Sequence, residues 1–228
     1  MPAPRRVDVR GVVLSVVEWR CKAPVAPLVV LLPGTGLTAR SWDAVAASLC
    51  GSRSVLAVDL RGHGQSDWPG AYSIALMAQD VGALLEGIAA PVDLVGHSLG
   101  GLVALRVAAA RRGRVRRLVL EDVGMPHPRR PDPPTRPEGD LRFDWRVVEQ
   151  VRPEVDDPDP GWPAVVTSVV APSLVLAGGP RSFVPAEHVA ELVAALPDGR
   201  SVTLDTGHEV HEADPERFTR ELLTFLGP

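Results

Sequence analysis

The chain has 228 residues, 45% of them hydrophobic, so it is long enough to bury a core as one domain and too short for two full domains. Its net charge of −4 excludes a basic nucleic-acid-binding surface, and no apolar run has the length of a membrane span or a signal peptide. Cys21 and Cys50 lack metal-like spacing, which predicts buried free thiols without a metal site. We therefore expect a cytoplasmic protein, and the near absence of lysine among many arginines indicates a bacterial, high-GC source.

The first part of the chain alternates predicted strands and helices. Residues 7–19 alternate polar and apolar positions around Gly11, as two antiparallel strands joined by a tight turn would. Continuous apolar runs follow, which are typical of strands buried on both faces of a parallel sheet. Buried strands and helices are predicted in alternation, at residues 25–32, 38–50, 54–58 and 73–90.

The stretch 92–101 has the pattern strand, sharp turn and helix. A β-branched run ends in Gly96-His97-Ser98-Leu99-Gly100 and continues into residues 102–110, which are strong helix formers. G-x-S-x-G in this context predicts a nucleophile elbow, in which a strained turn lifts the serine hydroxyl clear of the sheet. The Leu99 N–H, at the start of the helix, then points where an oxyanion could form.

A proline-rich segment follows the next predicted strand, residues 115–120. Residues 125–139 contain six prolines, too many for a helix or an interior strand, and we expect an extended surface connection there. A short helix is expected at 141–151, and 153–163 is expected to be a loop.

The last part of the chain resumes the alternation, with strands at 172–177 and 201–204 and helices at 185–196 and 215–226. Strands that alternate with helices throughout indicate an α/β fold, with a mostly parallel sheet covered on both faces. We predict a single domain over 1–228, with its core at 1–123 and 172–228 and a small insertion at about 124–171.

Several motifs fall in one order along the chain: Pro33-Gly34, the loop 59–66 (Asp-Leu-Arg-Gly-His-Gly-Gln-Ser), the segment 96–101, and Gly207-His208. With these motifs the chain resembles the α/β-hydrolase superfamily over essentially its whole length. The resemblance implies an eight-stranded sheet, a nucleophile after the fifth strand, an acid after the sixth or seventh, and a histidine after the eighth. It also implies a small-molecule acyl substrate, and we expect no cofactor and a monomer or homodimer.

The resemblance gives each catalytic role a residue. Ser98 would attack an acyl carbonyl, and His208 would take its proton and return it to the leaving group. Backbone N–H groups of Leu99 and Thr35 would form the oxyanion hole. In the same family the loop with Asp59 and His63 is a turn scaffold, so we expect a structural role for it.

The acid is the least regular part of the pattern. The family often carries Gly-x-x-Asp after the seventh strand, but residues 177–185 contain no carboxylate. The end of the sixth strand resembles the acid-bearing segment of some haloalkane dehalogenases, and Glu121 takes the place of the acid in that comparison. We favour Glu121, with Asp122 as the second choice, because adjacent strand residues face opposite ways and only one can point to His208. Alternatively, both carboxylates cap the strand end or pair with arginines.

The sequence favours a serine hydrolase that cleaves an ester, lactone or thioester, with Trp42, Trp145 and Phe183 as candidates to line an apolar acyl pocket. A serine nucleophile argues against dehalogenase and epoxide hydrolase chemistry, which needs a carboxylate. Two alternatives stay open: the same scaffold could catalyse acyl transfer, perhydrolysis, C–C cleavage or cyclisation, or bind a ligand without catalysis.

Overall fold

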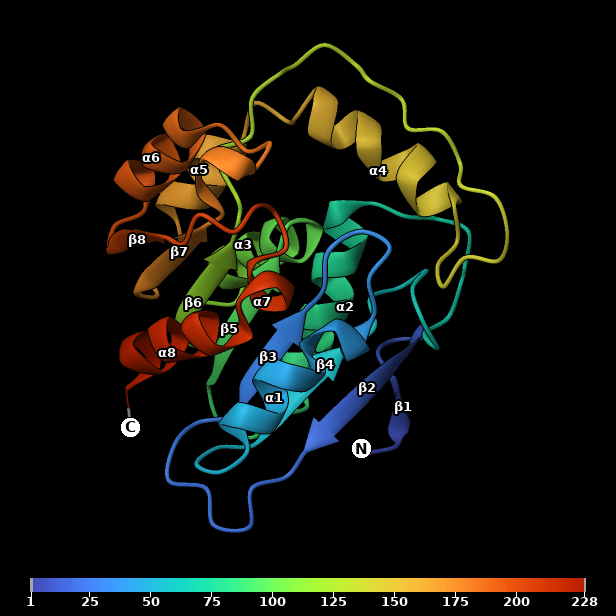
Figure 1. The fold of residues 1–228 in the computed structure, drawn as a ribbon. Helices are drawn as coiled ribbons and strands as arrows, with labels where there is room; N and C mark the ends of the chain where they lie inside the picture. The colour runs from blue at the N-terminus through green and yellow to red at the C-terminus, as the bar shows by residue number, and fades with distance from the viewer. Residues whose placement is uncertain (1, 228) are drawn as a thin grey trace.

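A single sheet of eight strands, in the order β1-β2-β4-β3-β5-β6-β7-β8, forms the centre of the computed structural model, which describes residues 2–227 (Figure 1). Strand β2 is antiparallel to β1 and β4, and all other neighbours are parallel. The strands are β1 (Pro4–Asp8), β2 (Val13–Trp19), β3 (Val29–Leu32), β4 (Val55–Val58), β5 (Val92–His97), β6 (Val115–Glu121), β7 (Ser173–Ala177) and β8 (Gly199–Thr203). The predicted eight-stranded, mostly parallel α/β fold is confirmed.

Helices cover both faces of this sheet (Figure 1). They are α1 (Asp43–Leu49), α2 (Ile74–Glu86), α3 (Leu99–Ala110), α4 (Arg146–Asp156), α5 (Trp162–Thr167), α6 (Ala186–Ala195), α7 (Val210–Ala213) and α8 (Pro215–Leu226), with two short 3₁₀ turns at Ala39–Trp42 and Gly179–Arg181. On one face α2 packs against α3, and on the other face α1 packs against α8.

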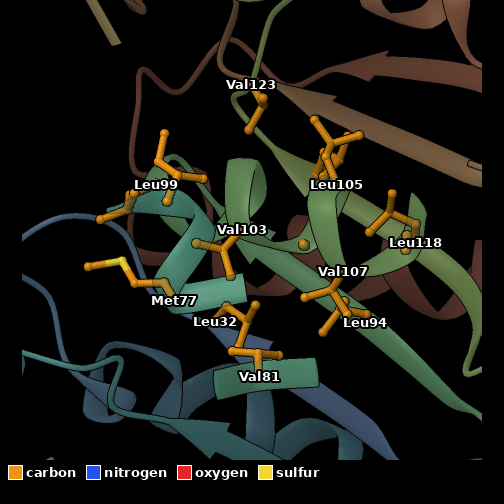
Figure 2. Packing of buried hydrophobic residues seen from close by; sticks show 14 of the residues in the cluster. Leu32, Met77, Val81, Leu94, Leu99, Val103, Leu105, Val107, Leu118 and Val123 are labelled. Atoms are coloured by element: carbon orange, nitrogen blue, oxygen red, sulfur yellow. The ribbon is translucent and has the colours of Figure 1, made fainter. Parts of the chain in front are cut away.

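Strand alternation divides the buried apolar side chains into two cores. In β3, Val30 and Leu32 contribute to the core under α2 and α3, whereas Val29 and Leu31 contribute to the core under α1 and α8. Figure 2 shows the first core, where Met77 and other side chains of α2 meet α3 above the strands. All four β3 side chains are buried, as the continuous apolar run predicts.

The segment between β6 and β7 differs from its prediction. Helix α4 begins five residues later than expected and continues through Pro153, so the predicted loop at 153–163 is wrong for the last turn of α4 and for the start of α5. The helix persists because Val147 and Val151, one turn apart, are buried against the core. The proline-rich stretch before it has no regular structure, as expected.

Two smaller observations complete the fold. Cys21 and Cys50 are free thiols, as expected, but each is only partly buried. In the described part of the chain, no helix is long and apolar enough to cross a membrane.

Candidate active site

Ser98 lies at the sharp turn between β5 and α3, with φ 51° and ψ −117°. This left-handed conformation is strained for a residue with a side chain. The glycines around it permit the turn: a Cβ on Gly96 would lie 2.3 Å from the Gly100 carbonyl oxygen, and a Cβ on Gly100 would lie 2.5 Å from the Leu32 carbonyl oxygen. The segment therefore has the backbone of the predicted elbow.

His208 binds the side chain of Asp122. Its Nδ1 lies 2.6 Å from Asp122 Oδ2, and the Asp122 side chain is 1% exposed. The Gly178 N–H donates to the other carboxylate oxygen at 2.8 Å, and the Ser182 hydroxyl donates to Oδ2. These bonds fix the carboxylate. Because Asp122 occupies Nδ1 of His208, Nε2 is the ring nitrogen that remains for another partner.

The structure corrects the choice between the two carboxylates, because Asp122 contacts His208 and Glu121 does not. Glu121 is the last residue of β6, and its carboxylate accepts the backbone N–H of His211 at 2.8 Å and lies 2.8 Å from His211 Nδ1. Asp122 lies beyond the strand with φ 49°, a turn that directs its side chain to the His208 loop. The argument that only one carboxylate can face His208 was right, but the preferred residue was wrong.

His97, the residue before the serine, is joined to the His208 loop. Its Nε2 lies 3.0 Å from the His208 carbonyl oxygen, which makes Nε2–H a donor, and the two imidazole centroids are 4.7 Å apart. Burial lowers the pKa of His97, because desolvation disfavours the charged ring. A Cβ on Gly34 would lie 2.6 Å from His97 Nδ1, which explains the small residue after Pro33.

A cavity of about 540 Å³ opens over this site, and Ser98, His208, Thr35 and Leu99 all line it. No protein acceptor within residues 2–227 takes the N–H of Thr35 or of Leu99. Both predicted oxyanion donors therefore adjoin the cavity with their N–H groups uncommitted.

The three predicted pocket aromatics separate. Trp145 and Phe183 line the cavity, and the Phe183 ring lies 4.2 Å from the His208 ring between centroids. Trp42 does not: it is fully buried on the opposite side of the sheet, stacked 3.9 Å from the His211 ring. The prediction for Trp42 is wrong because its large apolar ring fills the core under α1 and α8.

The loop 59–66 holds the backbone around the site, and within residues 2–227 it makes no hydrogen bond to Ser98. Asp59 accepts N–H groups from Ala39 at 2.7 Å and Gln65 at 3.0 Å, and Arg61 is paired with buried Asp80. His63 accepts the Gly36 N–H at 3.1 Å on Nε2, while its Nδ1 lies 3.2 Å from the Arg61 carbonyl. These contacts agree with the expected scaffold role.

One group of buried side chains has donors close enough to hold a metal ion. His97, Glu121 and His211 offer ligand atoms within 4.8 Å of one another, the only such group among the residues described. The carboxylate of Glu121 is already taken up by His211, and His97 donates to the His208 carbonyl. Among the residues described, these bonds leave His97 Nδ1 and His211 Nε2 buried without a hydrogen-bond partner.

With this geometry established, the chain matches the alpha/beta hydrolase family over residues 29–164, and it belongs to that family. It is similar to RutD of Pseudomonas savastanoi, which is named as a carbamate hydrolase, with 30% identity over 249 aligned positions that cover 91% of this chain and 96% of the relative. An esterase of Mycobacterium tuberculosis is 39% identical over 125 residues, 54% of this chain, and this region spans only 40% of that esterase.

Solved structures agree with the fold. The enol-lactonase from Burkholderia xenovorans matches with a TM-score of 0.85 at 23% identity, and the match covers 97% of this chain and 99% of the other. A hydrolase from Pseudomonas aeruginosa matches with a TM-score of 0.83 and 25% identity, over 99% of this chain and 98% of its own. The relatives support a hydrolase of the α/β family.

Proposed function

We propose that this protein is a serine hydrolase that cleaves a carboxylic ester, lactone or thioester of a small molecule through an acyl-enzyme on Ser98. The observation that carries the proposal is the strained Ser98 elbow, which opens into the same cavity as a histidine anchored by a buried carboxylate. A nucleophile, a base and a group that orients the base are the three parts that acyl transfer requires.

Asp122 holds His208 in one tautomer, with the proton on Nδ1 and the lone pair on Nε2. Nε2 takes the Ser98 proton as the hydroxyl oxygen attacks the carbonyl carbon, and the imidazolium that forms is stabilised by the carboxylate. The same proton then passes to the leaving alcohol or thiol. Water repeats the sequence on the acyl-enzyme and releases the acid.

The uncommitted N–H groups of Leu99 and Thr35 would stabilise the oxyanion of each tetrahedral intermediate. Leu99 is also the first residue of α3, whose helix dipole favours negative charge at this end.

Hydrolysis is favoured over a non-hydrolytic reaction because solvent reaches the site. The His208 side chain is 20% exposed, and Phe183, which packs beside it, is 69% exposed. A site that transfers an acyl group to another acceptor must exclude water, and this one is open. The names of the relatives, an esterase and an enol-lactonase among them, also support cleavage of ester-type bonds.

A fluorophosphonate probe tests the proposal directly. We expect the wild type to be labelled on Ser98 and to hydrolyse p-nitrophenyl esters of short acyl chains, and Ser98→Ala to do neither. A wild type that is folded and shows neither labelling nor turnover contradicts an activated serine.

A further inference from the structure

The segment between β6 and β7 places two guanidinium groups on the wall of the Ser98 cavity. Arg129 lies in the proline-rich connection, and Arg152 lies within α4. Much of the remaining wall is apolar, including Trp145, Trp162 and Val151. Charged groups on a partly apolar wall are the kind of feature that fixes the orientation of a ligand.

Both arginines are held by one carboxylate. Asp156 Oδ1 accepts Nε–H from Arg129 at 2.7 Å and from Arg152 at 2.9 Å, and the Asp156 side chain is 6% exposed. The backbone adds a further link, since the Arg129 N–H donates to the Asp156 carbonyl at 2.8 Å. The two guanidinium groups are therefore fixed through Nε, the atom nearest the stem.

The outer ends of the same guanidinium groups are uncommitted. Within residues 2–227, no protein acceptor takes an Nη–H from Arg129 or Arg152. Two cations share one anion, so the trio carries one surplus positive charge. A planar fork of free N–H groups on a fixed stem matches the two oxygens of a carboxylate.

Glu154 also lines the cavity, but its carboxylate interacts with groups other than the two arginines. Its carboxylate accepts the Ile74 N–H at 3.2 Å, at the start of α2, where the helix dipole favours an anion. Burial raises its pKa, while this bond and the nearby Arg106 oppose the rise. The nearby Arg106 offsets the charge of Glu154, so the trio of Arg129, Arg152 and Asp156 keeps its own surplus of one positive charge.

We propose that Arg129 and Arg152 form a carboxylate-binding subsite, and that the substrates are half-esters or lactones of dicarboxylic acids, with the free carboxylate on the acyl part. The proposal rests on the hydrolase function above and names its substrate class. A carboxylate fits better than a phosphate because one surplus charge balances a monoanion and not a dianion.

Paired substrates test this class. Monomethyl glutarate, adipate and pimelate are compared with methyl pentanoate, hexanoate and heptanoate by methanol release. We expect the best half-ester to have a kcat/KM at least about tenfold above its neutral partner, the lower range for a charge-assisted hydrogen bond. Half-esters that are no better than neutral esters at every length overturn the proposal.

Variants tie the preference to the two arginines. Arg129→Gln and Arg152→Gln should each lower the ratio of half-ester to neutral-ester kcat/KM by about tenfold, mainly through KM. Arg130→Gln, an exposed arginine of the same connection that does not line the cavity, should leave the ratio unchanged. Loss of both arginines would leave the buried Asp156 carboxylate without a counter-charge. The double variant is therefore made together with Asp156→Asn. An unchanged ratio in these variants, or an equal fall in the Arg130 variant, refutes the subsite.

Binding to an inactive protein separates the two proposals. Monomethyl adipate, a monoanion that Ser98→Ala should not cleave, is titrated into this variant, with and without Arg152→Gln, by calorimetry and by the fluorescence of Trp145 and Trp162 on the cavity wall. Saturable binding that weakens about tenfold without Arg152 supports the subsite even if no ester is cleaved, in which case only the hydrolase function fails. Ester cleavage without arginine-dependent binding of monomethyl adipate keeps the hydrolase and overturns the subsite.

Discussion

Asp122→Asn and Glu121→Gln form a matched pair, because each replaces one of two adjacent buried carboxylates with the corresponding amide. In Asp122→Asn the amide can still accept the Gly178 N–H on one side, so its NH₂ group faces Nδ1 of His208. An imidazole that accepts at Nδ1 carries its proton on Nε2. It can no longer accept the proton of Ser98.

This tautomer change predicts a fall in kcat of up to about 10⁴, as for the corresponding change in serine proteases, which is about 5.4 kcal/mol of transition-state stabilisation at 1.36 kcal/mol per tenfold. The carboxylate is buried and 2.6 Å from the ring, so solvent screens little of the interaction. Glu121→Gln leaves Asp122 and His208 in contact, and kcat should fall by less than about tenfold.

Glu121→Gln should act mainly on stability. Glu121 and His211 are both fully buried, and removing one partner of a buried pair typically costs about 3–5 kcal/mol. Glutamine keeps an acceptor for the His211 N–H, so we expect about 3 kcal/mol of lost unfolding free energy, at the lower end of that range.

The measurements are steady-state hydrolysis of p-nitrophenyl butyrate and urea unfolding followed by tryptophan fluorescence. Asp122→Asn that retains more than a tenth of the wild-type kcat contradicts the assignment of Asp122. If kcat of Glu121→Gln falls by about 10³ with unchanged stability, Glu121 and not Asp122 orients the histidine, and the assignment of Asp122 is wrong.

Three further outcomes follow from single contacts. Gly100→Ala should lower the unfolding free energy by at least about 2 kcal/mol, because the new Cβ would lie 2.5 Å from a backbone oxygen. The variant should also lose fluorophosphonate labelling. A variant that is labelled and as stable as the wild type contradicts the tight elbow. Phe183→Ala should change KM severalfold with no change in urea midpoint, since the ring is 69% exposed yet packs on His208. Burial lowers the pKa of His63 from 6.5, so the unfolded chain binds the proton first and stability falls as the pH drops below about 6.5, by up to about 1.4 kcal/mol per pH unit. His63→Gln should flatten this slope in urea titrations at pH 7.5 and 5.5, although buried His97 keeps part of it.

The sheet and the elbow could be predicted because their signals are local. A continuous apolar run such as residues 29–32 has few outcomes other than a doubly buried strand, and G-x-S-x-G between strand and helix restricts the backbone by sterics alone. Helix α4 was placed too early because its two buried valines report tertiary packing, which outweighs the proline in its last turn.

The acid and Trp42 could not be assigned in this way because each depends on a direction in space. Alternation in β6 shows that Glu121 and Asp122 diverge, but which of them meets His208 depends on the positive φ of Asp122 and on how the His208 loop crosses the sheet edge. Trp42 has the composition of a pocket residue, yet the side of the sheet on which it lies is set by packing with His211. No sequence pattern marks His211 as a partner of Glu121, apart from its place three residues after His208.

Two adjacent carboxylates at the end of β6 fix the His208 loop from two sides. Asp122 holds the imidazole at the cavity, and Glu121 holds the backbone N–H and the ring of His211 beneath it. His97 adds a third link to the same loop, because its Nε2–H donates to the His208 carbonyl oxygen. A loop on the surface would otherwise sample many positions, and a general base acts only when it is held within hydrogen-bond reach of the proton that it takes. The buried pairings under the loop therefore restrain the proposed base, while the chemistry that we propose would take place on the side that solvent reaches.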